Sequence, residues 1–488
     1  MRRRSLSFLP LVATSFLALS CGSSDSSGGD DDAATCETCP DTSPADVATD
    51  GVVTDGVVTD TIGSDTTPDT KPPACGTAAW PTYGHDGQRT FATDACITGP
   101  LTVAWSYSPA APAGKSAKAV QHVIADKDAV YLQWAATIVP YLGTTALDRV
   151  SLTGSRVWTM DTGTDANEGN WASIVGSNVV VNDDGVYFVD AATGKRGVGT
   201  GVDWWGQSIP NATGNGLWLA DTSKSDGPGL FVGLMDDKAK MTWKQNEQGT
   251  ACGDGFADTI GGIALDSGVL FYAASYTAGS GGKTLAFASG LYAFDAAAGT
   301  PKWKQPLTPT SVISAGDGLV YLIEGGKNLV ARKQSDGTPA WTMAVTSPGA
   351  QAPALAAGLV LIGTATGVAA FDAKTGASKW TSPVPGAAAR AYTITITNGC
   401  SGSQNQGASI ATSIAIASAS STVVVTGSDG VHVLDLTTGA EKWKGAVTGA
   451  KTPVHDPVLV GSTVYVVDSS PSSIAGFGAG SVFALKSP

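Results

Sequence analysis

Residues that could carry acid–base or metal chemistry are sparse in this chain of 488 residues. It has four histidines, at dispersed positions: His85, His122, His432 and His455. His85 and His455 each precede an aspartate, but neighbouring residues of a strand point to opposite faces, so we expect no catalytic pair. His432 stands between two valines in an expected strand. The histidines therefore predict packing or surface roles, and no catalytic residue is assigned.

An acidic string, DTGTDANEGN, covers residues 161–170. It has enough oxygen ligands for Ca²⁺ but lacks the loop spacing of known calcium-binding hands. We expect a solvated loop here and predict no metal site.

The N-terminus has the layout of an export signal. Arginines at positions 2–4 precede an apolar stretch over residues 6–19, followed by Ser20 and Cys21. This layout resembles a bacterial lipoprotein signal, in which the cysteine after a small residue is lipid-modified and becomes the new N-terminus. The resemblance predicts a signal peptide over residues 1–20 and lipidation of Cys21. Ordinary secretion with cleavage nearby is the alternative.

Six further cysteines, an even number in an exported chain, suggest disulfides. Proximity and the expected loops favour three pairs, although the sequence alone leaves the connectivity open: Cys36 with Cys39, Cys75 with Cys96, and Cys252 with Cys400. The first pair is a CxxC motif without the helix N-terminus that lowers a thiol pKa, so we expect no redox role for it.

Residues 21–73 differ in composition from the rest of the chain. They are rich in Ser, Thr, Gly, Asp and Pro and contain most of the acidic excess behind the net charge of −13. Such a segment is expected to be disordered and to act as a tether. The low positive charge of the chain argues against a nucleic-acid partner.

A recurring hairpin organises the remaining residues, 74–488. A glycine precedes a tryptophan by four residues in FDAKTGASKW (371–380), and the same spacing recurs at Gly154, Gly299, Gly337 and Gly439. The glycine supplies the positive φ of a tight turn, and the tryptophan begins the next strand. Apolar, β-branched runs upstream of each copy predict further short antiparallel strands.

Eight such units follow one another, and Val198 takes the tryptophan's place in unit two. The eighth unit stops before its tryptophan strand, and the segment around Trp105, residues 101–107, is the expected donor of the missing strand. We therefore predict an all-β, eight-bladed propeller with four-stranded antiparallel blades, closed by an N-terminal strand. A seven-bladed ring is the alternative if unit two or three is miscounted.

Aromatic residues fall into two groups. Six tryptophans share the repeat register and are predicted to pack between neighbouring blades: Trp158, Trp243, Trp303, Trp341, Trp380 and Trp443. Five aromatic residues lie outside that register and are predicted to form a binding surface where the connections between blades emerge: Trp134, Tyr141, Trp204, Trp205 and Tyr276.

The DAKTGASKW hairpin (372–380) and the opening WPTYGHDGQRT (80–90) resemble the pyrroloquinoline-quinone (PQQ)-type β-propeller repeat. This resemblance covers nearly all of residues 80–488. The family includes quinoprotein dehydrogenases and cofactor-free lipoproteins, among them the propeller subunit of the outer-membrane β-barrel assembly machinery.

The lipoprotein signal, the tether and the eight units are more similar to the second type. They imply a monomeric scaffold without catalysis or cofactor, anchored by lipid to the outer membrane on its periplasmic or cell-surface side. Its partners would be other cell-envelope proteins.

A PQQ-dependent dehydrogenase that oxidises alcohols or sugars, with PQQ and calcium, is the alternative function. Family enzymes cover the quinone with a disulfide between adjacent cysteines and hold Ca²⁺ beside it. The sequence has no adjacent cysteines, and no Asp-Glu-Asn set matches residue by residue, so the scaffold is favoured.

Overall fold

The computed structural model describes most of residues 75–487. The described ranges are 75–110, 116–139, 142–161, 172–182, 186–200, 206–221, 231–246, 257–277, 289–390, 408–451, 453–468 and 480–487. The predicted signal peptide and tether lie outside these ranges, and so do five cysteines: Cys21, Cys36, Cys39, Cys252 and Cys400.

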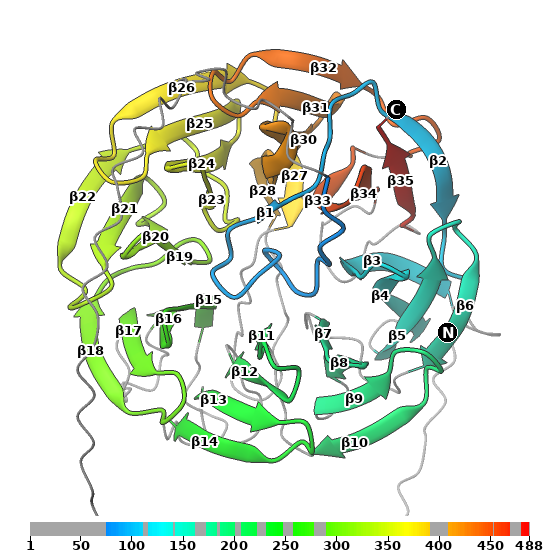
Figure 1. The fold of residues 1–488 in the computed structure, drawn as a ribbon, viewed down its shortest axis with the longest axis horizontal. Coiled ribbons are helices and arrows are strands. Elements are labelled where there is room, and N and C mark those ends of the chain that lie inside the picture. Colours follow the sequence, from blue (N-terminus) through cyan, green and yellow to red (C-terminus); the bar gives the residue numbers. More distant parts are fainter. Residues whose placement is uncertain are drawn as a thin grey trace, which may run out of the picture. The chain divides into compact units, whose positions relative to one another are not determined.

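The described strands form eight four-stranded antiparallel blades around a central channel (Figure 1). Units two and three each form a complete sheet, so the eight-bladed prediction is confirmed and the seven-bladed alternative is wrong. The first four blades, each from inner to outer strand, are β3 (Ser116–Ala125), β4 (Ala129–Val139), β5 (Leu142–Ser151) and β6 (Arg156–Asp161); β7 (Ser173–Val175), β8 (Asn178–Asn182), β9 (Val186–Asp190) and β10 (Arg196–Thr200); β11 (Gly206–Pro210), β12 (Gly216–Asp221), β13 (Phe231–Asp236) and β14 (Met241–Asn246); and β15 (Ala257–Asp266), β16 (Val269–Thr277), β17 (Gly290–Asp295) and β18 (Pro301–Pro306).

Blades 5 to 8 follow the same order. Their strands are β19 (Ser314–Gly316), β20 (Leu319–Glu324), β21 (Asn328–Lys333) and β22 (Pro339–Ala344); β23 (Ala354–Ala356), β24 (Leu359–Thr364), β25 (Gly367–Asp372) and β26 (Ser378–Pro383); β29 (Ser413–Ala417), β30 (Thr422–Gly427), β31 (Gly430–Asp435) and β32 (Glu441–Gly445); and β33 (His455–Val460), β34 (Thr463–Val467), β35 (Val482–Lys486) and β2 (Thr102–Tyr107). Four short elements lie outside this scheme: β1 (Ala92–Thr93), the hairpin β27 (Ala387–Arg390) and β28 (Ala408–Ala411), and the 3-10 helix η1 (Ser418–Ser420). Within the described residues, no helix has the length and apolar character needed to cross a membrane.

The ring closes as predicted. Strand β2 pairs antiparallel with β35 and supplies the outer strand of blade 8, with Tyr107 opposite Val482. The two ends of the propeller sequence thus share one sheet, and the ring leaves only short, protected strand edges.

The tryptophans pack between neighbouring blades, as expected. The indole on the outer strand of one blade lies flat against a glycine of the next blade's turn, and a Cβ at Gly376 would come within 2.7 Å of the Trp341 ring. In the described chain this contact occurs at seven junctions: Trp105 on Gly154, Trp158 on Gly194, Trp243 on Gly299, Trp303 on Gly337, Trp341 on Gly376, Trp380 on Gly439, and Trp443 on Gly99.

Most of these indoles also donate their N–H to a carbonyl of the neighbouring turn. The Trp303 indole, for example, donates to the Gln334 carbonyl at 2.8 Å. The turn glycines have the positive φ that was predicted, for example 72° at Gly376. Glycine is needed twice over, for the backbone conformation and for the close approach of the indole.

Candidate functional site: a channel closed at one end

An N-terminal segment, residues 80–96, crosses the channel and is hydrogen-bonded to every blade (Figure 1). We call it the plug. Its partners, taken in order, are Ala125 of blade 1 for Trp80, Ile174 of blade 2 for Pro81, Ser208 of blade 3 for Thr82, Leu265 of blade 4 for Gly87, Ala315 of blade 5 for Gln88, Leu355 of blade 6 for Thr90, Ile416 of blade 7 for Phe91, and Gly461 of blade 8 for Cys96.

In blades 1 to 7 these partners lie in the middle or towards the C-terminal end of the inner strand, and in blade 8 Gly461 directly follows the inner strand β33. The plug therefore closes the end of the channel where the inner strands finish. The short turns that follow the first and third strands of each blade lie at this same end, because consecutive antiparallel strands reverse direction.

Arg89 anchors the plug from within. Its side chain is fully buried, and its guanidinium donates to the Ile263 and Ser208 carbonyls at 3.1 and 2.8 Å and also to the Tyr83 carbonyl. A further bond runs to the Thr82 hydroxyl. Burial lowers the pKa of Arg89 to about 10, while the nearby Tyr83 and Asp86 act in the opposite direction. The cation thus joins the plug to blades 3 and 4 through neutral oxygen acceptors.

A buried hydroxyl cluster ties the plug to blades 2 and 3. The Thr82 hydroxyl lies 2.9 Å from that of Ser173 and donates to the Ser208 carbonyl at 2.8 Å. The hydroxyls of Ser173 and Ser208 are themselves 2.6 Å apart. Each buried polar atom in this cluster has a partner, so the inner strands of these two blades are held at the channel axis.

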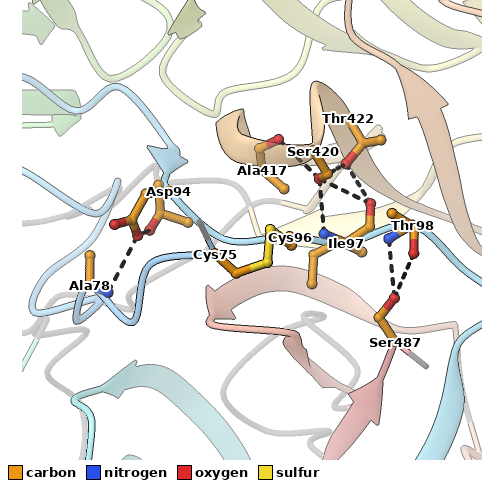
Figure 2. The surroundings of a disulfide bond; sticks show 11 residues. Cys75, Ala78, Asp94, Cys96, Ile97, Thr98, Ala417, Ser420, Thr422 and Ser487 are labelled. Atoms are coloured by element: carbon orange, nitrogen blue, oxygen red, sulfur yellow. Dashed lines mark hydrogen bonds between the residues drawn. A yellow bond between two sulfur atoms is a disulfide. The ribbon is translucent and has the colours of Figure 1, made fainter. Parts of the chain in front are cut away.

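The predicted disulfide between Cys75 and Cys96 is present (Figure 2). It joins the two sides of the plug across a sequence separation of 21. Immediately after it, Ile97 exchanges hydrogen bonds with Ser420 and also accepts one from Thr422 of blade 7. The disulfide thus closes the plug segment on itself, and the bonds of Ile97 hold its end against blade 7.

A cavity of about 30 Å³ remains where the plug meets blades 1, 6, 7 and 8. Its lining combines aromatic rings of the plug with polar side chains of the blades and includes Trp80, Tyr83, Phe91, His122, Gln351 and Asp456. This volume suits about two water molecules. Pockets for cofactor-sized ligands measure about 300 Å³ or more.

Two histidine–aspartate neighbours are hydrogen-bonded, which corrects the expectation that their side chains diverge. Nδ1 of His85 lies 3.4 Å from Asp86, and Nδ1 of His455 lies 3.0 Å from Asp456. The expectation was wrong because neither pair has regular strand backbone: φ is 76° at His85 and 51° at Asp456.

The surroundings of Asp86 favour its charged form. Burial alone would raise the pKa of Asp86, but the hydrogen bond and charge of His85 and the hydrogen bonds from Thr90 outweigh it and lower the pKa. Asp86 is therefore a structural anion of the plug, not a carboxyl poised to release a proton near neutral pH.

His432 lies in a strand, as expected, and the structure shows that it is buried. Its two ring nitrogens lie 2.7 Å from Glu441 and 2.9 Å from Asp429. The contact with Glu441 links β31 to β32, and the contact with Asp429 links β31 to the turn that precedes it, which gives His432 a structural role.

The structure describes two of the five predicted binding aromatics, Trp134 and Tyr276. Trp134 lies in β4 with 0% of its side chain exposed, so its assignment to a binding surface is wrong. Trp134 lies in the middle of β4 and packs in the hydrophobic core. Tyr141, Trp204 and Trp205 lie outside the described residues, and Tyr276 is described only as part of the backbone of β16.

The longest connections all start at the end of the channel opposite the plug. They follow the second and fourth strands of the blades and include residues 222–230, 247–256, 278–288, 391–407 and 469–479. We call this end the loop end. Cys252, Cys400 and the 162–170 part of the acidic string also fall in such connections, outside the described residues.

Sequence reasoning missed the role of the plug. The motif WPTYGHDGQRT was used only as a marker of the repeat family, whereas its residues form hydrogen bonds with blades 1 to 6 in turn. The available signal was Arg89, a lone arginine among small and aromatic residues just before the first blade.

The described residues do not fit a site for PQQ and calcium. They contain no group of three or more His, Cys, Asp or Glu side chains placed to hold a metal ion. The chain also lacks the adjacent cysteines that cover the quinone in family enzymes. No catalytic step is therefore derived from this channel.

The closed ring of repeated hairpins defines this chain as an eight-bladed β-propeller. A family model described as outer membrane protein assembly factor BamB matches residues 288–399, which form most of blades 4 to 6. No curated protein is similar enough in sequence to count as a relative.

Solved structures with this fold include two types of protein. The quinohemoprotein alcohol dehydrogenase from Comamonas testosteroni is similar with a TM-score of 0.58 and 14% identity, over 85% of this chain and 81% of that one. A europium-containing methanol dehydrogenase has a TM-score of 0.59 and 12% identity, over 84% and 98%. BamB from Moraxella catarrhalis has a TM-score of 0.45 and 13% identity, over 79% and 100%, and is too distant to support an argument. At these identities the similarity concerns the fold.

Proposed function

We propose that this chain is a lipid-anchored propeller of the cell envelope that binds other envelope proteins through its loop end, without catalysis. One observation carries the proposal: the plug bonds to all eight blades and closes one end of the channel, where described residues line a cavity of about 30 Å³. Recognition then falls to the outer surfaces, and the long connections are concentrated at one end.

Further support comes from the sequence. The lipoprotein-like signal ending at Cys21 and the acidic tether over residues 21–73 favour attachment at the outer membrane, on its periplasmic or cell-surface side. The matching family model describes an outer membrane assembly factor. A monomer whose partners are envelope proteins, and not nucleic acid, accords with these features.

The proposal is tested by site-specific photo-crosslinking of the full chain in its native envelope. A crosslinker at Trp204, in a connection at the loop end, should capture discrete envelope proteins. A matched crosslinker at Lys304, exposed on β18, should not. Equal capture from both positions, or none from position 204 and neighbouring connections, would contradict binding through the loop end.

A PQQ-dependent dehydrogenase acting on alcohols or sugars is the second candidate, and it rests on the similarity to two dehydrogenase structures. Titration of the purified protein with PQQ and Ca²⁺ separates the two functions. One-to-one binding with a raised melting temperature would favour the enzyme, because a ligand that binds the native state stabilises it. No change in absorbance or melting temperature would favour the scaffold.

A further inference from the structure

The junction between blades 2 and 3 differs from the other seven junctions of the described ring. Elsewhere an indole lies against a glycine of the neighbouring turn. Here the outer strand β10 carries Val198 at the tryptophan position, and its side chain is 50% exposed. The facing turn of blade 3 carries Ala239, with φ of 60°, where the other turns have glycine.

These two replacements match one another. An added Cβ at the turn glycines would come closer to the facing indole than non-bonded atoms approach, so alanine and tryptophan exclude each other at a junction of this geometry. Because Ala239 already has that Cβ, an indole from another part of the chain could not pack at this junction. It is a smaller junction, without the indole area and without the N–H bond to the next turn.

The outer strand of blade 2 is weak for a second reason. Its five residues, RGVGT, include Gly197 and Gly199. Glycine lowers the stability of a strand because it adds backbone entropy and no packing area. Arg196 stacks over Tyr187 of the same blade, at 3.4 Å from the ring centroid, so it ties β10 to its own blade.

The channel side of the same junction is held tightly. The Thr82, Ser173 and Ser208 hydroxyls link the plug with both inner strands. The first turns of the two blades also touch through backbone, since a Cβ at Gly176 would come within 2.9 Å of the Gly214 carbonyl oxygen.

The junction between blades 3 and 4 has the indole contacts that the junction between blades 2 and 3 lacks. The Ala296 carbonyl of blade 4 accepts two indole N–H groups from blade 3, from Trp218 at 2.8 Å and from Trp243 at 3.1 Å. Blade 3 is thus coupled firmly to blade 4 and weakly, at the rim, to blade 2.

We propose that the ring has one built-in seam, between blades 2 and 3, which opens at the rim while the hydroxyl cluster at the axis acts as its hinge. This conformational property is independent of the binding role proposed above. Opening would expose apolar side chains packed between the two blades, among them Phe188, Leu217 and Met241. Local opening of this kind occurs at the least stable contacts of a fold.

Hydrogen exchange of the full chain, followed by mass spectrometry, tests the seam. Amides of β10 and of the 236–240 turn should have protection factors at least about tenfold lower than amides of β22 and the 372–377 turn, which occupy equivalent places at a locked junction. Equal protection in the two regions would overturn the proposal.

Exchanging the junction residues sharpens the test. The V198W/A239G variant should raise protection in β10 by about tenfold, whereas A239G alone should not raise it. The reverse variant, W341V/G376A, should lower protection in β22 towards that of β10. If V198W/A239G fails to fold, the reverse variant decides, and unchanged protection of β22 in it would overturn the seam.

Discussion

The two ends of the propeller channel are built differently. The plug end has short turns, a disulfide, a buried arginine and indoles packed on glycines, all in described parts of the chain. The loop end has the long connections that follow the second and fourth strands of the blades. Because the plug end supplies these stabilising contacts, the connections at the loop end can vary in length and composition.

Loss of Arg89 should have the largest effect on stability. Arg89→Leu would remove the guanidinium donor from the buried Ile263 and Tyr83 carbonyls and one of the two donors to the Ser208 carbonyl. Unmet buried acceptors cost about 1–3 kcal/mol each. We expect a loss of about 3–5 kcal/mol in the free energy of unfolding, measured by chemical denaturation. Lys304→Ala, at an exposed position, is the control and should change it little. A loss no greater than in this control would show that the plug does not stabilise the ring.

Removal of a junction indole comes next. Trp303→Ala removes the ring packed on Gly337 and its bond to Gln334, and should cost about 3 kcal/mol in denaturant melts. Val198→Ala at the seam should cost less than about 1 kcal/mol. Similar losses for the two variants would mean that the indoles contribute no more than the smaller junction does.

The disulfide should contribute somewhat less. The double variant C75S/C96S frees a segment with a sequence separation of 21, which predicts a loss of about 2–3 kcal/mol. In this variant the hydrogen-exchange rates of residues 80–94 should increase more than those of the outer strands. An increase spread evenly over all blades would argue against a specific role in holding the plug.

Acid should destabilise the turns of the plug end by a smaller amount. The hydrogen bond from Lys379, with those from Thr375, lowers the pKa of Asp372 to about 2, and Lys442 has the same effect on Asp435. A carboxyl whose pKa is lowered on folding stabilises the protein above its ordinary pKa of 3.8, and this stabilisation is lost as the pH falls towards 2. The melting temperature should therefore fall between pH 4 and pH 2, and less steeply in D372N/D435N. An identical slope in the variant would contradict this origin.

Changes at the loop end should affect binding and not stability. The variant W204A/W205A should shift the free energy of unfolding by less than about 0.5 kcal/mol. Photo-crosslinking from another position in the same connection should lose its envelope partners. A large loss of stability would place these two residues in the core and remove the contrast between the two ends.

The sequence predicted the fold well because the repeat is local. Each turn glycine and the tryptophan four residues later lie in one hairpin, so their spacing reports on a structure formed by near neighbours. The expected donor of the missing outer strand of unit eight, around Trp105, was found for the same reason. Counting the strands along the chain is enough to show that unit eight lacks one. Cys75 and Cys96 were also close enough in sequence to be paired by proximity.

Tertiary structure alone decided what depends on distant contacts. Arg89 bonds to Ser208 and Ile263, which no sequence spacing relates to it. The plug's contacts with every blade and the burial of Trp134 likewise depend on residues far apart in the sequence. The His85–Asp86 and His455–Asp456 bonds depend on positive φ angles that a strand model does not contain. The sequence thus determined the blades, because their signals are short-range, whereas the closed channel and the seam required the ring to bring its two ends and its neighbouring blades together.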